Sequence, residues 1–297
     1  MQLNSEIVLT PPRASATVVL LRDAPQKGLE VFLLRRHLAS AVLGGAYVFP
    51  GGKLDVADCD PGLFAHMDAD PQSLHRALGE PELPLTTALG LYVAAVREVL
   101  EECGVLFARS HPNVPVHDAN QRRQWQQQLH GGQAFGDLLK QTGLHLDMHH
   151  LAPWSRWITP RQPSVTNKRF DTRFFVAVLP KTQQPVHDNI EAIDSVWLSP
   201  MEALKRYWAG DLPLVPPQIM TLVALQSHPT TQSVLDFARQ QTPPMILPEP
   251  FDEAGVRTLC YPGDPRHSVQ QRAMPGPTRL RFVAGRFEPV GGFEEYL

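Results

Sequence analysis

The sequence predicts an α/β protein in which helices are layered on a set of strands. Short runs of β-branched and aliphatic residues, bounded by turn-forming residues, recur through the chain and predict strands. An amphipathic pattern over residues 87–103 predicts a long helix among them. Strands and helices do not alternate strictly, and this mixture is typical of a layered α/β core. With 297 residues, of which 43% are hydrophobic, the chain can form one large domain, alone or with additions.

The first part of the chain predicts a hairpin and a glycine turn. Polar residues and Gly28 separate the first two apolar runs, which is the pattern of a hairpin or meander. The third run ends at Gly51-Gly52, where glycine lets the backbone approach a ligand closely. Residues 59–86 are rich in proline and aspartate, with one helical turn expected at 73–78. The three expected strands are 16–21, 29–34 and 47–49.

The helix expected at 87–103 is the most informative segment. Glu98, Glu101 and Glu102 fall within an arc of about 100° on one side of it. Such neighbouring like charges predict a compensating cation, and hard oxygen ligands suit Mg²⁺ or Mn²⁺. A solvated glutamate-rich face is the alternative interpretation. An apolar stripe on roughly the opposite side consists of Tyr92, Val96, Val99 and Cys103.

The rest of the chain continues the mixture of strands and helices. Gly104 is expected to end the long helix, and 105–107 to form a short strand. Ser199-Pro200-Met201-Glu202 has the order of residues that starts a helix. After residue 240 the chain is proline-rich and weakly patterned, with one hairpin expected from Arg279. Helices are expected at 119–129, 134–142, 200–208, 217–226 and 231–240, and strands at 154–159, 170–179 and 195–198.

Composition excludes several classes of protein. A formal net charge of −3 gives no sign of a nucleic-acid binder. Cys59, Cys103 and Cys260 are odd in number and far apart, so neither a disulfide framework nor a zinc motif is expected. No stretch approaches 18 apolar residues, and no basic segment followed by an apolar run opens the sequence. We therefore expect a cytoplasmic location, with no membrane association.

These residues resemble the signature of the Nudix hydrolases. Arg97–Val105 matches the second half of the signature in full, and Gly52 matches the first, with Asp58 where the family usually has glutamate. The signature has seven residues between its halves, whereas residues 59 to 96 amount to 38, an insertion of 31. An insert at this place resembles one branch of the family, which includes a mammalian peroxisomal coenzyme A diphosphatase. Three further sequence motifs also resemble this branch of the family: FPGGKLD from Phe49, WITP from Trp157 and RFDTRFF from Arg169.

The resemblance implies a fold and a domain plan. The fold is the Nudix α/β/α sandwich with a mixed sheet, helical insertions and a C-terminal helical extension. The Nudix domain is expected to span 12–240, with an insert at about 59–86 and a helical insertion at about 108–150. Residues 241–297 are expected to form a proline-rich C-terminal extension. The insert could serve as a lid or as an element of a homodimer, and the sequence does not decide between these roles.

The resemblance also implies a metal site. Glu98, Glu101 and Glu102 would be carboxylate ligands of Mg²⁺ or Mn²⁺, and the Gly52 carbonyl would be a backbone ligand. Arg97 would orient the glutamates through ion pairs, since it lies four residues before Glu101. Either Glu101 or Glu98 is expected to be the general base. The sequence does not separate these two candidates.

Residues outside the signature complete the expected site. Glu191 is the candidate for an additional carboxylate ligand, with an exposed loop acid as the alternative. Lys168 or Arg169 is expected to contact a substrate phosphate, with the polar face of a half-buried strand as the alternative. Arg35 and Arg36 are either further phosphate contacts or solvated strand ends.

The implied activity is metal-dependent hydrolysis of a small-molecule nucleoside diphosphate compound. Coenzyme A or acyl-coenzyme A, cleaved to 3′,5′-ADP and (acyl)phosphopantetheine, is the first expectation. NADH, ADP-ribose or a nucleotide sugar is the second. A non-catalytic ligand sensor is the third, and the complete set of glutamates argues against it. Fold alone does not decide among these functions.

Overall fold

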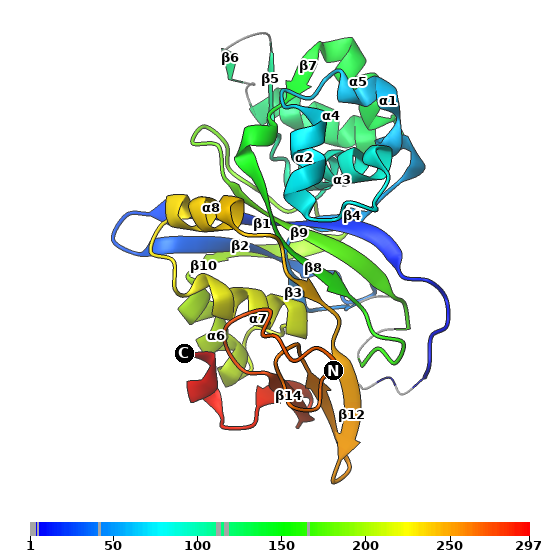
Figure 1. The fold of residues 1–297 in the computed structure, drawn as a ribbon. Coiled ribbons are helices and arrows are strands. Elements are labelled where there is room, and N and C mark those ends of the chain that lie inside the picture. The colour runs from blue at the N-terminus through cyan, green and yellow to red at the C-terminus, as the bar shows by residue number, and fades with distance from the viewer. Residues whose placement is uncertain (1–3, 5, 41–42, 111–113, 116–118, 165–166) are drawn as a thin grey trace.

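The computed structural model describes residues 4, 6–40, 43–110, 114–115, 119–164 and 167–297. Within them, a mixed sheet lies between two layers that contain helices (Figure 1). Its strands are β1 (Arg13–Ala24), β2 (Gly28–Arg36), β3 (Tyr47–Val48), β4 (Gly51–Lys53), β8 (Leu151–Ile158), β9 (Phe170–Val178), β10 (Ala192–Leu198) and β11 (Met245–Ile246).

The sheet combines parallel and antiparallel pairs, as the expected fold class requires. Its main path runs β10-β2-β1-β9-β8-β11, while β3 pairs with β2 and β4 pairs with β1. The β1–β9 and β8–β11 pairs are parallel and the other pairs are antiparallel. The hairpin expected around Gly28 is the β1–β2 pair, and Gly28 has the positive φ of 73° that favours glycine. The α/β sandwich with a mixed sheet is confirmed.

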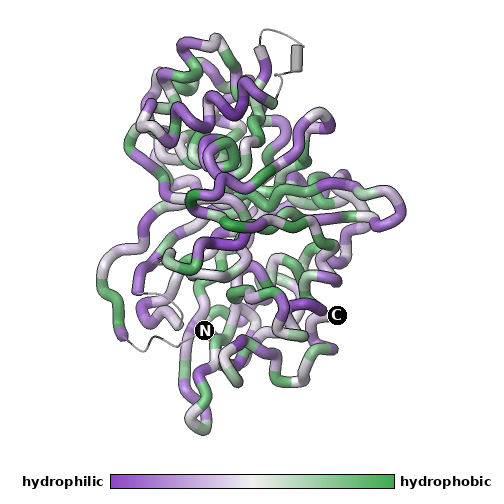
Figure 2. The backbone as a smooth tube through the Cα atoms, turned by 180° about the vertical axis from the view of Figure 1, so that it is seen from behind, coloured by the Kyte–Doolittle hydropathy of each residue, from purple (hydrophilic) through white to green (hydrophobic). Residues whose placement is uncertain are grey.

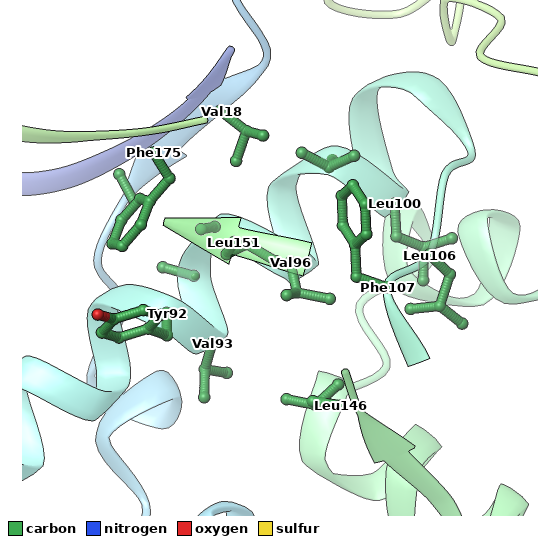
Figure 3. Close-up of a cluster of buried hydrophobic side chains, with 14 of the residues drawn as sticks. Val18, Tyr92, Val93, Val96, Leu100, Leu106, Phe107, Leu146, Leu151 and Phe175 are labelled. Atoms are coloured by element: carbon green, nitrogen blue, oxygen red, sulfur yellow. The ribbon is translucent and has the colours of Figure 1, made fainter. Parts of the chain in front are cut away.

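One layer is built around the long helix. The expected stripe of Tyr92, Val96, Val99 and Cys103 is fully buried. Figure 3 shows Tyr92 and Val96 among side chains from the sheet, and the rings of Tyr92 and Phe175 are 4.8 Å apart. The helices of this layer are α1 (Pro61–Phe64), α2 (Pro71–Leu78), α3 (Leu85–Cys103), α4 (Ala119–His130) and α5 (Phe135–Thr142).

The strand expected at 105–107 is wrong. These residues follow Gly104, which ends α3 at a φ of 66°, and their side chains are buried without strand pairing. The Gln183 side chain takes the place of a neighbouring strand. It accepts from Leu106 N–H and donates to the Leu106 carbonyl, both at 2.9 Å. A small sheet begins just afterwards, with β5 (Ala108–Ser110), β6 (Val114–Pro115) and β7 (Leu144–Leu146).

The opposite layer contains the C-terminal helices. The Ser199 side chain accepts from Glu202 N–H and caps the first of them, as expected from the sequence. Figure 1 shows two of these helices, α6 and α7, across the sheet from α3. Buried residues of the three C-terminal helices pack in one cluster with β1 and β2. They are α6 (Pro200–Ala209), α7 (Pro216–Leu225) and α8 (Thr231–Gln240).

The proline-rich C-terminal region forms a sheet of its own. The hairpin expected from Arg279 is present, and two further strands that the sequence did not indicate extend it. Tyr207 and Tyr296 both donate to the Phe287 carbonyl, at 2.8 and 3.0 Å, and tie this sheet to α6. Figure 2 shows hydrophobic backbone positions concentrated along the central strands. The four strands are β12 (Glu249–Glu253), β13 (Val256–Cys260), β14 (Arg279–Val283) and β15 (Arg286–Pro289).

All three cysteines are free thiols, and Cys103 is buried in the core. In the part of the chain that the structure describes, every helix is too short or too polar to cross a membrane.

The insert is fastened to the central sheet by a cluster of charges. Glu80, which follows α2, accepts from Arg173 Nε at 2.9 Å and pairs with Arg156 at 2.8 Å. Asp171 pairs with the same two arginines, at 2.7 Å with Arg156 and 3.0 Å with Arg173. The Arg173 side chain is 4% exposed, so its charge depends on these partners.

We expect Glu80→Gln to lower the free energy of unfolding by about 3 kcal/mol, because it leaves a buried arginine with one carboxylate. Chemical denaturation of both proteins measures the difference. Glu82→Gln is the matched control, since Glu82 is exposed in the same loop. Equal losses in the two variants would contradict an anchoring role for Glu80.

Candidate active site

Arg97 joins three separate segments of the chain. Its guanidinium donates to both carboxylate oxygens of Asp58, at 2.9 and 3.0 Å, and to the Lys53 carbonyl at 3.0 Å. It also donates to Glu98 at 2.9 Å and to Glu101 at 3.0 Å. Asp58 belongs to the 3₁₀ helix η1 (Val56–Cys59), where the insert begins. The insert therefore leaves and returns at one place, and β4 stays beside the glutamates.

Gly51 and Gly52 begin strand β4, where a turn was expected, and lie against the helix. Gly51 N–H donates to Glu102 at 2.8 Å. Gly51 has a φ of 155°, and a Cβ there would lie 2.4 Å from the Ala16 carbonyl oxygen. A Cβ on Gly52 would instead lie 2.2 Å from Glu98 Oε1. A side chain at Gly51 would thus meet the backbone of β1, whereas one at Gly52 would meet only the end of the Glu98 side chain.

The loop before β10 brings Glu191 to the same place. The Asp188 side chain accepts from three successive backbone N–H groups, those of residues 190, 191 and 192, and fixes the turn. Glu191 pairs with Arg36 at 3.7 Å and lines the same cavity as Glu98. Glu191 therefore lies at the same cavity as Glu98, as expected, although the two residues are far apart in the sequence. Its role as a metal ligand stays a prediction.

The glutamates form a region of concentrated negative charge. Burial raises the pKa of Glu98 to about 7, Arg97 opposes this rise, and the neighbouring Glu101 and Glu191 add to it. Burial and the charge of Glu98 hold the pKa of Glu102 well above its usual range. Burial also raises the pKa of Glu101. Each carboxylate makes ionisation of the others more costly, and a cation among them would reduce that cost.

The donor set fits a hard divalent cation. Carboxylates and a backbone carbonyl are the oxygen ligands that Mg²⁺ and related ions prefer. In the orientations described, the carboxylates of Glu98 and Glu101 are turned to Arg97 and that of Glu102 to Gly51. Among the described residues, no group of three or more His, Cys, Asp or Glu side chains is arranged to hold a metal ion. Metal binding would therefore require these side chains to reorient, which the partly exposed Glu101 can do.

The helical insertion supports the end of α3. Gln126 on α4 donates to the Glu101 carbonyl at 2.8 Å, where the last turn of α3 has no helical donor of its own. His130 lies 3.9 Å from Asp188, which fixes the Glu191 turn. The insertion thus contacts both the helix and the loop that supply the carboxylates.

A cavity of about 550 Å³ opens beside Glu98 and Gly52. Its floor is one face of the central sheet, made by alternate residues of β1 and β9 that include Ser15, Thr17 and Thr172. Ser15 and Thr172 are joined by a hydrogen bond of 2.7 Å across the two strands. Its opposite wall includes Pro216 and Pro217 of α7 together with Pro248, Leu259 and Phe287 of the C-terminal region.

The four candidate phosphate contacts divide into two pairs. Lys168 and Arg36 line the cavity, and Arg35 and Arg169 are not among its lining residues. Arg169 donates to the backbone carbonyls of Thr159 and Thr10, and Arg35 lies over the Tyr47 ring. The polar side of β9 faces the insert, where Arg173 and Asp171 meet Glu80. The geometry therefore favours Lys168 and Arg36 as cations for a bound anion.

Part of the cavity is lined by residues that the sequence did not indicate. Arg13, Ser15 and Thr17 line it, but the strand was expected to begin only at residue 16. Their alternation with small apolar residues was a usable signal, because one face of such a strand is buried and the other is polar. Leu259 and Phe287 had no signal, since nothing local indicates that the C-terminal sheet folds back over the site.

The chain is similar to several known proteins of one family. The family model described as the NUDT19 Nudix domain matches residues 7–225. The chain is 27% identical over 271 residues to the acyl-coenzyme A diphosphatase NUDT19 of Gallus gallus, covering 76% of this chain and 71% of that protein. It is 29% identical over 246 residues to the protein of the same name from Homo sapiens, covering 73% of this chain and 65% of that protein. The crystal structure of a Nudix hydrolase from Alicyclobacillus acidocaldarius superposes with a TM-score of 0.62 at 28% identity, covering 80% of this chain and 99% of that one.

The two glycines of β4 should respond differently to the same substitution. Gly51→Ala should lower the free energy of unfolding by about 2 kcal/mol, because the new Cβ meets the backbone of β1. Gly52→Ala should leave stability nearly unchanged and weaken Mn²⁺ binding by about tenfold or more, because it displaces the Glu98 carboxylate. Denaturation and calorimetric titration with Mn²⁺ measure the two effects. Mn²⁺ affinity equal to wild type in Gly52→Ala would show that Glu98 is not part of the cation site.

Proposed function

The chain belongs to the Nudix hydrolase family, and we propose that its substrate is coenzyme A or an acyl-coenzyme A. The observation that carries this proposal is the insert between Asp58 and Arg97, which the NUDT19-type model spans and which leaves the site intact. The relatives of that type are named acyl-coenzyme A diphosphatases. The products would be 3′,5′-ADP and (acyl)phosphopantetheine.

The proposed cation site consists of Glu98, Glu101, Glu102 and Glu191 with the Gly52 carbonyl. Mg²⁺ or Mn²⁺ bound there would neutralise diphosphate oxygens and make a water molecule more acidic. Arg97 holds Glu98 and Glu101 through one nitrogen, which sets the two carboxylates side by side. Because the two carboxylates are held next to each other, they need only turn locally to bind a cation, and less order is lost during the reaction.

The general base would be Glu98 or Glu101. Glu98 lines the cavity, whereas Glu101 is not among the lining residues. This difference favours Glu98 as the group that takes a proton from the attacking water, with Glu101 positioned behind it. Both are held by Arg97, so loss of either charge would alter the other.

The cavity offers separate regions for the parts of the substrate. Both Arg36 and Lys168 line the cavity and are suited to binding phosphates. The guanidinium of Arg36 can donate two parallel hydrogen bonds to a phosphate, whereas the ammonium of Lys168 acts as a single point charge. Apolar residues such as Phe174 and Trp157 continue the floor away from the glutamates. A ligand with charged phosphates at one end and an extended, weakly polar arm at the other fits this order.

A cytoplasmic location stays a prediction from the sequence.

Hydrolysis of a substrate panel tests the proposal. The panel contains coenzyme A, an acyl-coenzyme A, dephospho-coenzyme A, NADH and ADP-ribose, each with Mg²⁺ and with Mn²⁺. We expect cleavage of the coenzyme A compounds, and Glu98→Gln and Glu101→Gln should each lower kcat by about 100-fold or more. Unchanged thermal unfolding of the variants would show that the loss is catalytic.

Each outcome of this panel separates two of the functions. Cleavage limited to NADH or ADP-ribose would keep the catalytic site and reject coenzyme A. Tight binding of a diphosphate compound without turnover would support a sensor. Near wild-type turnover in Glu101→Gln would remove Glu101 from the mechanism.

Lys168→Ala tests the predicted phosphate contact. We expect KM for coenzyme A to rise about tenfold, because one charge-assisted hydrogen bond is lost. KM for dephospho-coenzyme A should change little, since that compound lacks the 3′-phosphate. Lys181→Ala is the control, because Lys181 is exposed and lines neither cavity. Equal increases for both substrates would place Lys168 elsewhere along the substrate.

A further inference from the structure

A second cavity of about 670 Å³ lies next to the catalytic one. Its walls are mostly apolar and aromatic, with Trp154, Met220, Ile246, Phe237 and Met274 among them. Arg272 is the one lining residue with a permanent charge in the described part of the chain, and its guanidinium donates to the carbonyls of Met274 and Gly276. The volume and the lining suit an uncharged apolar group rather than a phosphate.

The two cavities lie end to end along the same elements. On α7, residues 216–218 line the catalytic cavity, and Met220, Thr221 and Ala224 line the second one. On β8, residues 157 and 158 line the catalytic cavity, whereas 153–155 line the second one. The C-terminal segment follows the same course, because β11 lies beside β8 at the second cavity and Pro248 borders the catalytic one.

Trp157 is the residue that lines both cavities. Its side chain is packed between Phe174 and Tyr261, with ring centroids 6.4 and 6.0 Å away. Its indole Nε1 is buried and has no hydrogen-bond partner among the described residues. A buried tryptophan N–H usually has such a partner. Rotation of this ring would therefore break packing contacts and no hydrogen bond.

The sheet fixes how far Trp157 lies from the chemistry. Strand pairing aligns Lys53 of β4 with Ser15, Ser15 with Thr172, and Thr172 with Trp157. These four residues form a row across four neighbouring strands on the floor of the catalytic cavity. Three strand spacings place Trp157 roughly 14 Å from β4, beside the glutamates. The row gives an extended substrate arm a continuous floor from the cleavage site to the second cavity.

We propose that the second cavity receives the far end of a long acyl group and that Trp157, between the cavities, limits the length of the chain accepted. This inference rests on the proposed function, because it assigns the substrate arm of the same site. The phosphopantetheine arm itself extends to Trp157, so that a short acyl group ends beside the indole ring. Longer groups must displace the indole ring to enter the second cavity. Trp157 is thus a specificity-determining residue that takes no part in the cleavage itself.

The test compares kcat/KM for coenzyme A with that for acetyl-, octanoyl- and lauroyl-coenzyme A. Trp157→Leu should raise the lauroyl-to-acetyl ratio of kcat/KM about tenfold, because the smaller side chain opens the way to the second cavity. Trp208→Leu is the matched control, because Trp208 lines neither cavity. Ala224→Phe fills the second cavity and should lower the value for the lauroyl compound about tenfold, with little effect on the acetyl compound.

The outcomes separate this inference from the proposed function. If coenzyme A is cleaved and both variants keep the wild-type dependence on chain length, the role of Trp157 and of the second cavity is rejected and the proposed function stands. If wild type cleaves none of the coenzyme A compounds, both fail. If circular dichroism shows that Trp157→Leu is unfolded, Ala224→Phe decides the question, since it adds volume where the structure has space.

Discussion

The buried guanidinium of Arg97 is the interaction on which the rest of the site depends. It holds the end of β4, the start of the insert and two glutamates of α3 with one planar group. Burial works against its charge, but the hydrogen bond to Asp58 and the fields of Glu98 and Glu101 outweigh this and raise the pKa of Arg97. Lysine could not replace it, because an ammonium cannot form the bidentate contact with Asp58.

The same interaction explains how a long insert is tolerated inside the site. Asp58 and Arg97 are 39 positions apart and in direct contact. The residues between them fold as short helices against α3, where Tyr92 donates to the Leu74 carbonyl at 3.0 Å, and against the sheet through Glu80. The entropy of closing a loop grows only logarithmically with its length, so a closed excursion costs little more than a short one. The insert therefore changes the outer surface of the helical layer and leaves the carboxylates where they are.

The two faces of the central sheet separate packing from binding. On β1, Ala16 and Val18 face α3 in the core, while Ser15 and Thr17 face the cavity. On β9 the residues alternate in the same way, with Thr172 and Phe174 on the cavity side. The C-terminal sheet, which lies beyond the segment matched by the family model, supplies part of the opposite wall. The carboxylates of the proposed cation site and the residues proposed to surround the substrate arm thus come from different parts of the chain.

The sequence by itself determined the long helix, its buried stripe, its glutamates and most of the strands, because these depend on periodicity among neighbouring residues. It also indicated that Gly52 and Glu191 belong with the glutamates, through resemblance rather than through spacing. Only the tertiary structure decided that Lys168 and Arg36 line the cavity while Arg169 binds backbone carbonyls. It alone showed that Gln183 replaces a strand at Leu106 and that Leu259 and Phe287 cover the site. These features arise from contacts between residues far apart in the chain, which depend on how whole elements pack and leave no periodic trace in the local sequence.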